Sequence, residues 1–263
     1  MRIISFNANG IRAAARKGFF EWLPEQQADV VCIQETKAQE HQLDKPEFRP
    51  DGHHCFYFDA ERKGYSGVAI YARQEPDEVI RGLGEGFEEF DAEGRYIEAR
   101  FGKLSVASLY LPSGSAGDHR QDSKWRFLEA FMPRMREMMA DDREYILCGD
   151  WNIAHTKADI KNWRGNQKNS GFLPEERAWL DELFGDAGWV DAFRQIEQPE
   201  HSYTWWSHRG QAWANNTGWR IDYHVVTPGL GKQVERTAIY TDERLSDHAP
   251  LTIDYAGEIG DFR

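Results

Sequence analysis

The 263-residue chain has few cysteines and no long hydrophobic run. Its three cysteines are too few and odd in number for a disulfide framework, and none has a CxxC or Cys/His metal spacing. Cys32 and Cys148 lie in short apolar runs, so we expect them to be buried thiols of a reducing compartment. No stretch approaches the roughly 20 apolar residues that span a bilayer, and the N-terminus lacks a signal-peptide pattern. These absences predict a cytoplasmic protein without membrane contact.

The motifs of several large enzyme classes are also absent. No GxxxxGK[ST] loop or dinucleotide-binding glycine fingerprint is present, so the sequence gives no sign of nucleoside triphosphate use. A GxSxG nucleophile elbow is missing, which leaves a Ser-His-Asp acyl-transfer triad without support. Because there is no Cys₂His₂ or His-rich set, we expect no structural or hydrolytic zinc site.

Basic residues are in the minority. The chain has 32 Lys and Arg against 44 Asp and Glu, a formal net charge of −12, which taken alone argues against nucleic-acid binding. The charges are segregated, however: residues 85–93 contain acids and no base, whereas residues 160–174 contain three bases and no acid. Because a ligand meets a local face of a protein, the basic segment can still bind a polyanion.

Hydrophobic residues make up 40% and charged residues 29% of the chain, as in soluble globular proteins. Short β-branched runs predict strands at 2–6, 29–34, 54–58, 66–72, 94–100, 104–110, 144–149, 219–226 and 248–254. Helical periodicity predicts helices at 11–23, 122–140 and 174–187. Strands and helices mix without regular βαβ alternation, which indicates an α/β protein with antiparallel or mixed sheets. No repeat or linker divides the chain, so we expect one domain over residues 1–263.

Polar side chains recur where the predicted strands end. They are Asn7, Glu35, Tyr110, Asp150, Asn152, Asp222, Asp247 and His248. Each alone is explained as a turn former or a helix cap, but strand ends that meet at one sheet edge would form a single polar cluster. Carboxylate and amide oxygens suit Mg²⁺, which keeps waters and bridges to phosphate oxygens. Metal-assisted hydrolysis of a phosphate ester is the chemistry that fits this set best.

The same residues stand in motifs that resemble a known family. The motifs are residues 5–12 (SFNANGIR), 34–37 (QETK), 64–69 (GYSGVA), 110–114 (YLPSG), 149–155 (GDWNIAH), 219–223 (WRIDY) and 246–250 (SDHAP). Together and in this order, they are similar to the exonuclease III class of apurinic/apyrimidinic endonucleases, within the endonuclease/exonuclease/phosphatase superfamily. The resemblance implies a four-layer α/β sandwich, in which two mixed β-sheets pack face to face with helices outside. It also places the active site at one edge of that sandwich.

The resemblance implies a metal site with Mg²⁺ as the cofactor and Mn²⁺ as a substitute ion. Glu35 would be the principal ligand. The residues implied at the metal are Asn7, Glu35, Asp150, Asn152, Asp247 and His248.

The resemblance also implies catalytic roles. Asp150 would orient or deprotonate the attacking water, and Asn152 and His248 would stabilise charge on the phosphate oxygens. Asp222 would hold the imidazole of His248, and Tyr110 would contact the phosphate or assist the leaving group. As an alternative, Tyr110 and Asp222 are only structural hydrogen-bond partners.

The implied substrate is double-stranded DNA with abasic sites, cut 5′ to the site to leave a 3′-hydroxyl. The enzyme would be a monomer, associated with the nucleoid while it acts. Lys161, Arg164 and Lys168 are expected to contact the DNA backbone, and the loop 208–216 is expected to reach into DNA. The balance with 3′→5′ exonuclease and 3′-end-cleaning activity is left open.

An aromatic cluster would form the pocket for the flipped-out baseless sugar. By match of motif, the pocket is lined by Trp205, Trp219 and Ile221, whereas Trp206 is as well explained as core. Two other readings belong to the same fold: hydrolysis of inositol phosphates or phospholipids, and RNA-associated regulation without catalysis. The basic segment 160–174 argues against the first, and the complete set of catalytic residues argues against the second.

Overall fold

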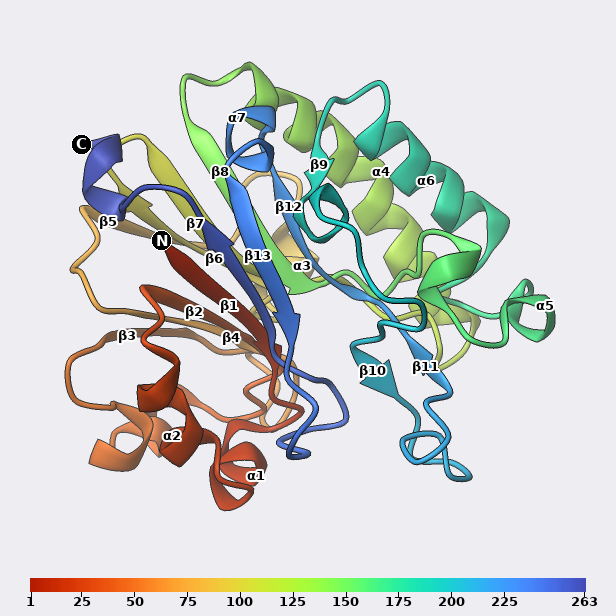
Figure 1. The fold of residues 1–263 in the computed structure, drawn as a ribbon, viewed down its shortest axis with the longest axis horizontal. Helices are drawn as coiled ribbons and strands as arrows, with labels where there is room; N and C mark the ends of the chain where they lie inside the picture. Colours follow the sequence, from red (N-terminus) through yellow and green to blue (C-terminus); the bar gives the residue numbers. More distant parts are fainter.

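The computed structural model describes residues 1–263, and most of its strands form two six-stranded sheets (Figure 1). The first sheet has the order β13-β14-β1-β2-β4-β3, with β1 (Arg2–Asn7), β2 (Val30–Gln34), β3 (His54–Phe58), β4 (Val68–Ala72), β13 (Val234–Ile239) and β14 (Leu251–Tyr255). The second has the order β5-β6-β7-β8-β12-β9, with β5 (Glu78–Arg81), β6 (Tyr96–Phe101), β7 (Leu104–Tyr110), β8 (Glu144–Asp150), β9 (Val190–Asp191) and β12 (Asp222–Val226). A separate hairpin pairs β10 (Trp205–Trp206) with β11 (Gly218–Trp219).

Helices and short turns connect these strands. The α-helices are α1 (Ile11–Arg16), α2 (Phe19–Trp22), α3 (Glu88–Asp91), α4 (Asp118–Ala140), α5 (Trp163–Asn166), α6 (Pro174–Phe184) and α7 (Pro228–Gly231). The 3₁₀ turns are η1 (Leu23–Gln26), η2 (Glu40–Leu43), η3 (Pro46–Phe48), η4 (Lys157–Asp159), η5 (Ala192–Gln195) and η6 (Ile259–Phe262). None of the helices combines the length and the apolar composition that a membrane span needs.

Each sheet has one parallel pair of strands at its centre. β1 and β2 are parallel in the first sheet, β7 and β8 are parallel in the second, and every other pairing within the two sheets is antiparallel. Because parallel strands end at the same edge, the residues that follow or close these four strands are brought together. β12 runs antiparallel to β8, so its first residue, Asp222, pairs with the last residue of β8, Asp150.

Apolar side chains fill three layers. Along β1, Ile3 faces the other sheet, whereas Ile4 faces the outer layer, as the alternation of a strand requires. α1 and α2 cover the outer face of the first sheet, and α4 and α6 cover the outer face of the second (Figure 1). The expected four-layer sandwich of two mixed sheets is therefore confirmed.

Several predicted boundaries were wrong. The helix predicted at 11–23 is broken at Gly18, whose φ of 93° is left-handed, and the helix predicted at 174–187 ends at Phe184. The strand predicted at 219–226 is interrupted between β11 and β12, and the one predicted at 248–254 starts only after Pro250, which lacks an N–H to donate. The sequence did not predict β5 and β13, because these edge strands are largely polar and only partly buried.

Candidate active site

A polar cleft of about 930 Å³ lies where the parallel strand pairs of both sheets end. Seven of the eight residues singled out at strand ends line this cleft or are buried directly beneath it. The lining members are Glu35, Tyr110, Asp150, Asn152, Asp247 and His248, and Asn7 lies beneath them in hydrogen-bond contact with Asp150. The eighth, Asp222, is buried behind His248. The strand ends therefore form one polar cluster.

Asn7 joins the two sheets at the bottom of the cleft. Its side-chain Nδ2 donates to Glu35 Oε1 at 3.1 Å and to Asp150 Oδ2 at 2.9 Å. Asn7 ends β1 and Glu35 follows β2 in one sheet, whereas Asp150 ends β8 in the other. Because the asparagine is completely buried, these contacts fix both carboxylates relative to each other.

His248 lies between two aspartates. Its Nδ1 is 2.9 Å from Asp222 Oδ2, and its Nε2 is 3.7 Å from Asp150 Oδ2. All three side chains are almost completely buried, and Asp222 Oδ1 has no hydrogen-bond partner. Asp222 therefore orients the imidazole so that Nε2 points toward Asp150 and the cleft.

Burial and mutual proximity shift the pKa values of this cluster. Burial raises the pKa of Asp150 well above its usual range, and the charges of Asp222 and Glu35 raise it further, whereas His248 and the hydrogen bond from the backbone N–H of Asn152 lower it. Burial alone would lower the pKa of His248, but Asp222 and Asp150 hold it above its ordinary value. Negative charge is thus in excess here, which is the condition that favours a bound cation.

The donor set fits a hard divalent cation. Ligand atoms of Glu35, Asp150 and His248 lie within 4.8 Å of one another. Asp247 also lines the cleft, and its carboxylate accepts from Trp205 Nε1 at 3.2 Å and from Asn9 Nδ2 at 3.1 Å. Oxygen ligands of this kind are those preferred by Mg²⁺ and Mn²⁺.

Among the polar residues of the cleft that sequence reasoning missed, Asn9 and Lys37 lie beside the predicted metal ligands. Asn9 bridges Asp247 and Lys37, and Lys37 Nζ lies 3.2 Å from Glu35 Oε2. Each stands two residues beyond a predicted ligand, Asn7 or Glu35, inside a motif that was already recognised. Asn9, Glu35 and Lys37 have left-handed φ values of 43°, 50° and 49°, a backbone conformation that non-glycine residues adopt at strained functional turns.

Tyr110 is held against a buried arginine that the sequence did not single out. The guanidinium of Arg95 lies 4.8 Å from the Tyr110 ring and donates to the Tyr110 carbonyl oxygen at 3.0 Å. Arg95 also donates to the hydroxyl of Tyr65 at 2.9 Å, and the guanidinium of Arg120 lies 5.5 Å from the Tyr65 ring. Glu93 pairs with both guanidinium groups, 2.6 Å from Arg95 and 3.1 Å from Arg120, so two cations face one carboxylate in this wall of the cleft.

Asn152 stands at a tight turn after β8. Its φ is 52°, its backbone N–H donates to Asp150 Oδ1 at 2.9 Å, and its Nδ2 donates to the carbonyl oxygen of Leu111 at 2.7 Å. The amide nitrogen carries two hydrogens, so one donor remains for a ligand in the cleft.

Trp205, Trp219 and Ile221 line the cleft together, as the sequence motifs imply. The two indole rings meet edge to face, with centroids 5.9 Å apart. Gly171 completes this apolar corner: a Cβ there would lie 3.0 Å from the Trp219 ring, and the glycine φ of 93° is left-handed. The corner is small and apolar beside a charged floor. Trp206, the next residue of β10, faces the opposite way and is buried.

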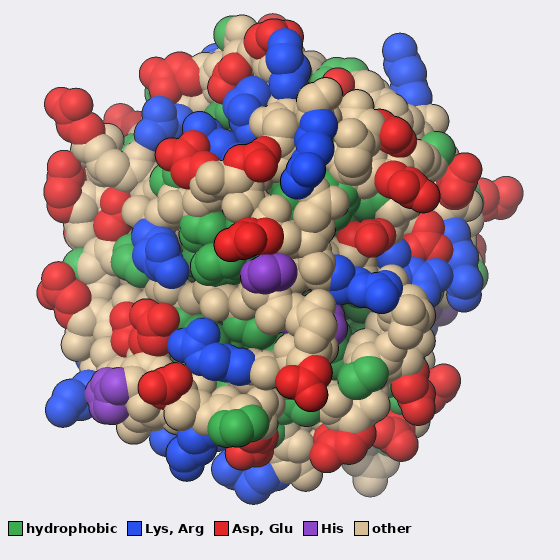
Figure 2. Space-filling view, turned by 90° about the vertical axis from the view of Figure 1, so that its left-hand side faces the viewer, with side chains coloured by type: hydrophobic (Ala, Val, Ile, Leu, Met, Phe, Trp, Pro, Cys, Tyr) green, Lys and Arg blue, Asp and Glu red, His purple; other side chains and the backbone are tan.

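The three predicted DNA-contact bases are separated by the structure. Lys168 lines the cleft, whereas Lys161 lies beside His201 at 3.2 Å and Arg164 stacks on Trp163 with 4.5 Å between guanidinium and ring centroid. All three are exposed on the segment around α5, which projects on the side of the molecule away from both termini (Figure 1). By contrast, the face that carries the edge strands β3 and β5 shows acidic and basic side chains interspersed (Figure 2).

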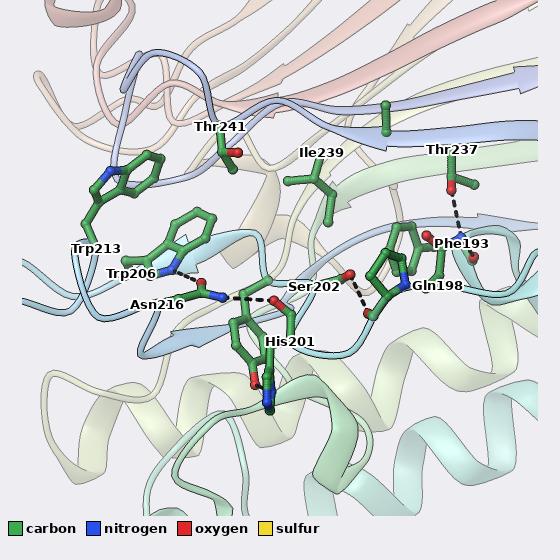
Figure 3. Close-up of a pocket in the computed structure, with 13 residues that line it drawn as sticks. Phe193, Gln198, His201, Ser202, Trp206, Trp213, Asn216, Thr237, Ile239 and Thr241 are labelled. Carbon is green, nitrogen blue, oxygen red and sulfur yellow. Dashed lines mark hydrogen bonds between the residues drawn. The ribbon is translucent and has the colours of Figure 1, made fainter.

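A second cavity, of about 500 Å³, lies on the other face of β10 (Figure 3). Its polar groups bond one another: Trp206 Nε1 donates to Asn216 Oδ1 at 3.0 Å, and Gln198 Nε2 donates to Thr237 Oγ1 at 2.7 Å. No Asp, Glu, Lys or Arg lines it. The chemistry of the molecule therefore belongs to the cleft and not to this cavity.

Fold and cleft together define a hydrolase of phosphate esters: a four-layer sandwich with a buried Asp–His–Asp array beside an acid and amide cluster. The chain belongs to the Endonuclease/Exonuclease/phosphatase family, which residues 4–248 match. It is 41% identical to an exodeoxyribonuclease of Bacillus subtilis (strain 168), over 96% of this chain and 98% of that protein. It is 36% identical to the DNA repair nuclease APEX1 of Danio rerio, over 96% of this chain and 81% of that protein.

Solved structures agree with this assignment. An AP endonuclease from Archaeoglobus fulgidus has a TM-score of 0.87 and 27% identity, over 98% of this chain and all of that one. A 3′ phosphatase from Neisseria, bound to a product DNA hairpin, has a TM-score of 0.89 and 26% identity, over 98% of this chain and all of that one. The family and the fold expected from the sequence motifs are confirmed.

Proposed function

We propose that the protein is a Mg²⁺-dependent DNA repair phosphodiesterase that incises duplex DNA 5′ to abasic sites and leaves a 3′-hydroxyl. The observation that carries the proposal is the Asp222–His248–Asp150 array, set in an acidic floor beside the small corner formed by Trp205 and Trp219. Relatives named exodeoxyribonuclease, AP endonuclease and 3′ phosphatase support accompanying action on 3′ ends. The whole chain, residues 1–263, acts as one catalytic domain.

Glu35 would hold the metal ion, with Asn7, Asp150, Asn152, Asp247 and His248 as the surrounding residues. The ion, Mg²⁺ or Mn²⁺, supplies Lewis-acid polarisation of a phosphoryl oxygen and offsets developing negative charge.

The chain's own residues supply proton transfer and charge stabilisation. Asp150 accepts a proton from the attacking water, and its ionisation depends on the positive charges around it, because burial and neighbouring acids raise its pKa. His248 is held cationic by Asp222 and donates from Nε2 toward a phosphate oxygen. Asn152 donates its remaining amide hydrogen to the same phosphate. Tyr110, fixed by Arg95, faces the cleft from β7 and contacts the phosphate or the leaving group.

The apolar corner would receive the baseless sugar. Extrusion of an abasic nucleotide costs little because no base has to be unstacked, and a corner closed by Trp205, Trp219 and Ile221 favours the smaller group. Lys161, Arg164 and Lys168 would contact the DNA backbone beyond the cleft. A single chain carries every residue of this mechanism, so we propose that the enzyme acts as a monomer. A substrate in chromosomal DNA would place the enzyme in the cytoplasm, associated with the nucleoid.

The test uses three labelled duplexes: one with a tetrahydrofuran abasic analogue, one with a 3′-phosphate and one with blunt ends. We expect Mg²⁺-dependent incision on the 5′ side of the analogue, with product ends that a polymerase extends. EDTA should abolish the reaction. Failure to incise the abasic duplex, or incision that resists EDTA, would contradict the proposal. A preference for the 3′-phosphate duplex would replace abasic incision by end cleaning as the main activity.

A further inference from the structure

A lysine and a glutamate form a completely buried ion pair behind the cleft. Lys124 of α4 and Glu176 of α6 both have 0% exposed side chains, and Lys124 Nζ lies 2.7 Å from Glu176 Oε1. Two desolvated charges are costly to bury, and replacing such a pair by apolar side chains is often neutral or stabilising. Stability alone therefore gives a weak account of this pair, and its other contacts point toward the cleft.

The lysine holds the backbone of Asn152. Lys124 Nζ donates to the Asn152 carbonyl oxygen at 2.8 Å. This is the residue with a left-handed φ of 52°, and its own N–H is bonded to Asp150 Oδ1. The lysine therefore fixes the strained turn that carries the water-activating and the phosphate-binding residue of the proposed mechanism.

The glutamate holds the segment of the cleft wall that lies beside this turn. Glu176 Oε2 accepts from the backbone N–H of Gly171 at 2.6 Å and of Leu173 at 3.1 Å. The carbonyl oxygen of Gly171 in turn accepts from the N–H of Ala154, two residues beyond Asn152, at 2.8 Å. Gly171 is the residue against the Trp219 ring, so the pair links the phosphate side of the cleft to its apolar corner.

We propose that Lys124 is a positioning residue for the proposed reaction and that Glu176 is its partner. Lys124 fixes the position of the turn at Asn152, and with it that of Asp150, relative to the phosphate of the substrate. Glu176 connects this turn to the segment at Gly171, next to the corner that would receive the sugar. The inference rests on the proposed function, because it concerns the same cleft. Small displacements of a reacting group reduce turnover strongly, so the effect falls on kcat.

The test compares two double variants that join the same helices. Lys124→Met with Glu176→Met removes the buried pair without leaving an unpaired charge. The control, Arg136→Met with Glu182→Met, removes an exposed pair between α4 and α6, in which Arg136 NH2 lies 2.8 Å from Glu182 Oε1. Steady-state incision of the abasic duplex gives kcat and KM, and urea unfolding gives stability.

We expect the buried-pair variant to fold with a lowered urea midpoint, because the N–H groups of Gly171 and Leu173 lose their acceptor. Its kcat should fall about 10- to 100-fold, and its KM should change less than about threefold. The control should retain the parental kcat. A folded buried-pair variant with parental kcat would overturn the inference, and so would an equal loss in the control. Absence of incision by the parent protein would instead contradict the proposed function, because the inference concerns the ratio of variant to parent.

A second variant covers the case in which the double variant does not fold. Lys124→Arg keeps a cation against Glu176, but its planar guanidinium places the donors differently from Nζ. We expect a folded protein with a kcat at least about threefold below that of the parent. A folded Lys124→Arg protein with parental kcat would show that the lysine is only structural.

Discussion

Two buried clusters of charged side chains differ in their balance of charge. Each contains a residue of the segment 220–222. Arg220 pairs with Asp159 at 2.7 Å and with Asp191 at 2.6 Å, and Arg194 adds a second cation 2.6 Å from Asp159. This cluster holds two guanidinium groups against two carboxylates. Two residues further on, Asp222 belongs to the acid cluster of the cleft, in which carboxylates outnumber cations.

The pKa values of two buried aspartates record this difference. Burial alone would raise the pKa of Asp159, but Arg220 and Arg194 hold it well below its usual range. The pKa of Asp150 is raised, because burial and neighbouring acids outweigh His248. Two guanidinium groups balance the carboxylates of the first cluster, whereas the excess of carboxylates in the second favours a bound cation.

The largest effect is expected from neutralising the aspartate of the unbalanced cluster. Asp150→Asn keeps the size of the side chain but removes the proton acceptor, so incision should fall about 10⁴-fold, or about 5.4 kcal/mol in the activation barrier. Stability at pH 7 without metal should stay the same or rise, because the raised pKa of Asp150 costs the parent stability at any pH above the pKa of the unfolded chain. Single-turnover incision and urea unfolding measure the two quantities. A variant that keeps more than a tenth of parental activity would exclude Asp150 as the base.

The same substitution in the balanced cluster should have the opposite outcome. Asp159→Asn leaves Arg220 and Arg194 without one of their counter-charges, so the free energy of unfolding should fall by about 3 to 5 kcal/mol. Turnover of the protein that remains folded at low temperature should stay within about tenfold of the parent. Stability within 1 kcal/mol of the parent, on the order of an exposed pair, would show that this cluster contributes as little as surface ion pairs do.

The buried histidine His224, on β12, is expected to have a smaller effect on stability, and that effect depends on pH. His224 lies two residues beyond Asp222 and is completely buried; its Nδ1 lies 3.1 Å from the Tyr255 hydroxyl, and no carboxylate is bonded to it. Burial lowers the pKa of His224 to about 3. The unfolded chain binds a proton near pH 6.5, so the stability that this residue contributes is present above pH 6.5 and is lost as pH falls toward 3.

His224→Gln removes this titration and keeps a side chain that can bond Tyr255. Between pH 6.5 and 4.5 the parent should lose about 2 to 3 kcal/mol more stability than the variant. Urea unfolding at a series of pH values measures both slopes, and the acids common to the two proteins cancel in the difference. Parallel slopes would mean that His224 is protonated in the fold.

The acid cluster of the cleft was predictable from the sequence because its members stand at strand ends. Asn7 and Asp150 each close a run of apolar residues, and the motifs around them assign the order of the strands. The register then places Asp222 opposite Asp150 without further information. The neighbours of each side chain could not be predicted, such as the Arg95 guanidinium over the Tyr110 ring, because the β6–β7 hairpin determines which backbone groups pair but not the direction of a long side chain.

The cluster around Arg220 shows more clearly what the sequence could not predict. Arg220 stands inside a recognised motif, yet its partners Asp159 and Asp191 come from segments about 60 and 30 residues away, each of which reads as an ordinary turn. The same holds for Lys124 and Glu176, which read as surface residues of two amphipathic helices. Ion pairs between distant segments depend on how the layers pack, and alternation within one segment does not encode that.

Exposed cations give the smallest effect and complete the comparison. Lys161, Arg164 and Lys168 are in solvent, so each contributes through screened attraction to phosphate and not through burial. Replacing all three by Gln should leave stability unchanged and reduce the slope of log affinity against log salt by up to about 2.7, or 0.9 for each phosphate contact. Fluorescence anisotropy with an abasic duplex, in EDTA and at several salt concentrations, measures the slope.

Because only Lys168 lines the cleft, the single Lys168→Gln variant separates the contribution of Lys168 to the slope from that of Lys161 and Arg164. A slope that stays parental in the triple variant would remove this segment from the DNA interface.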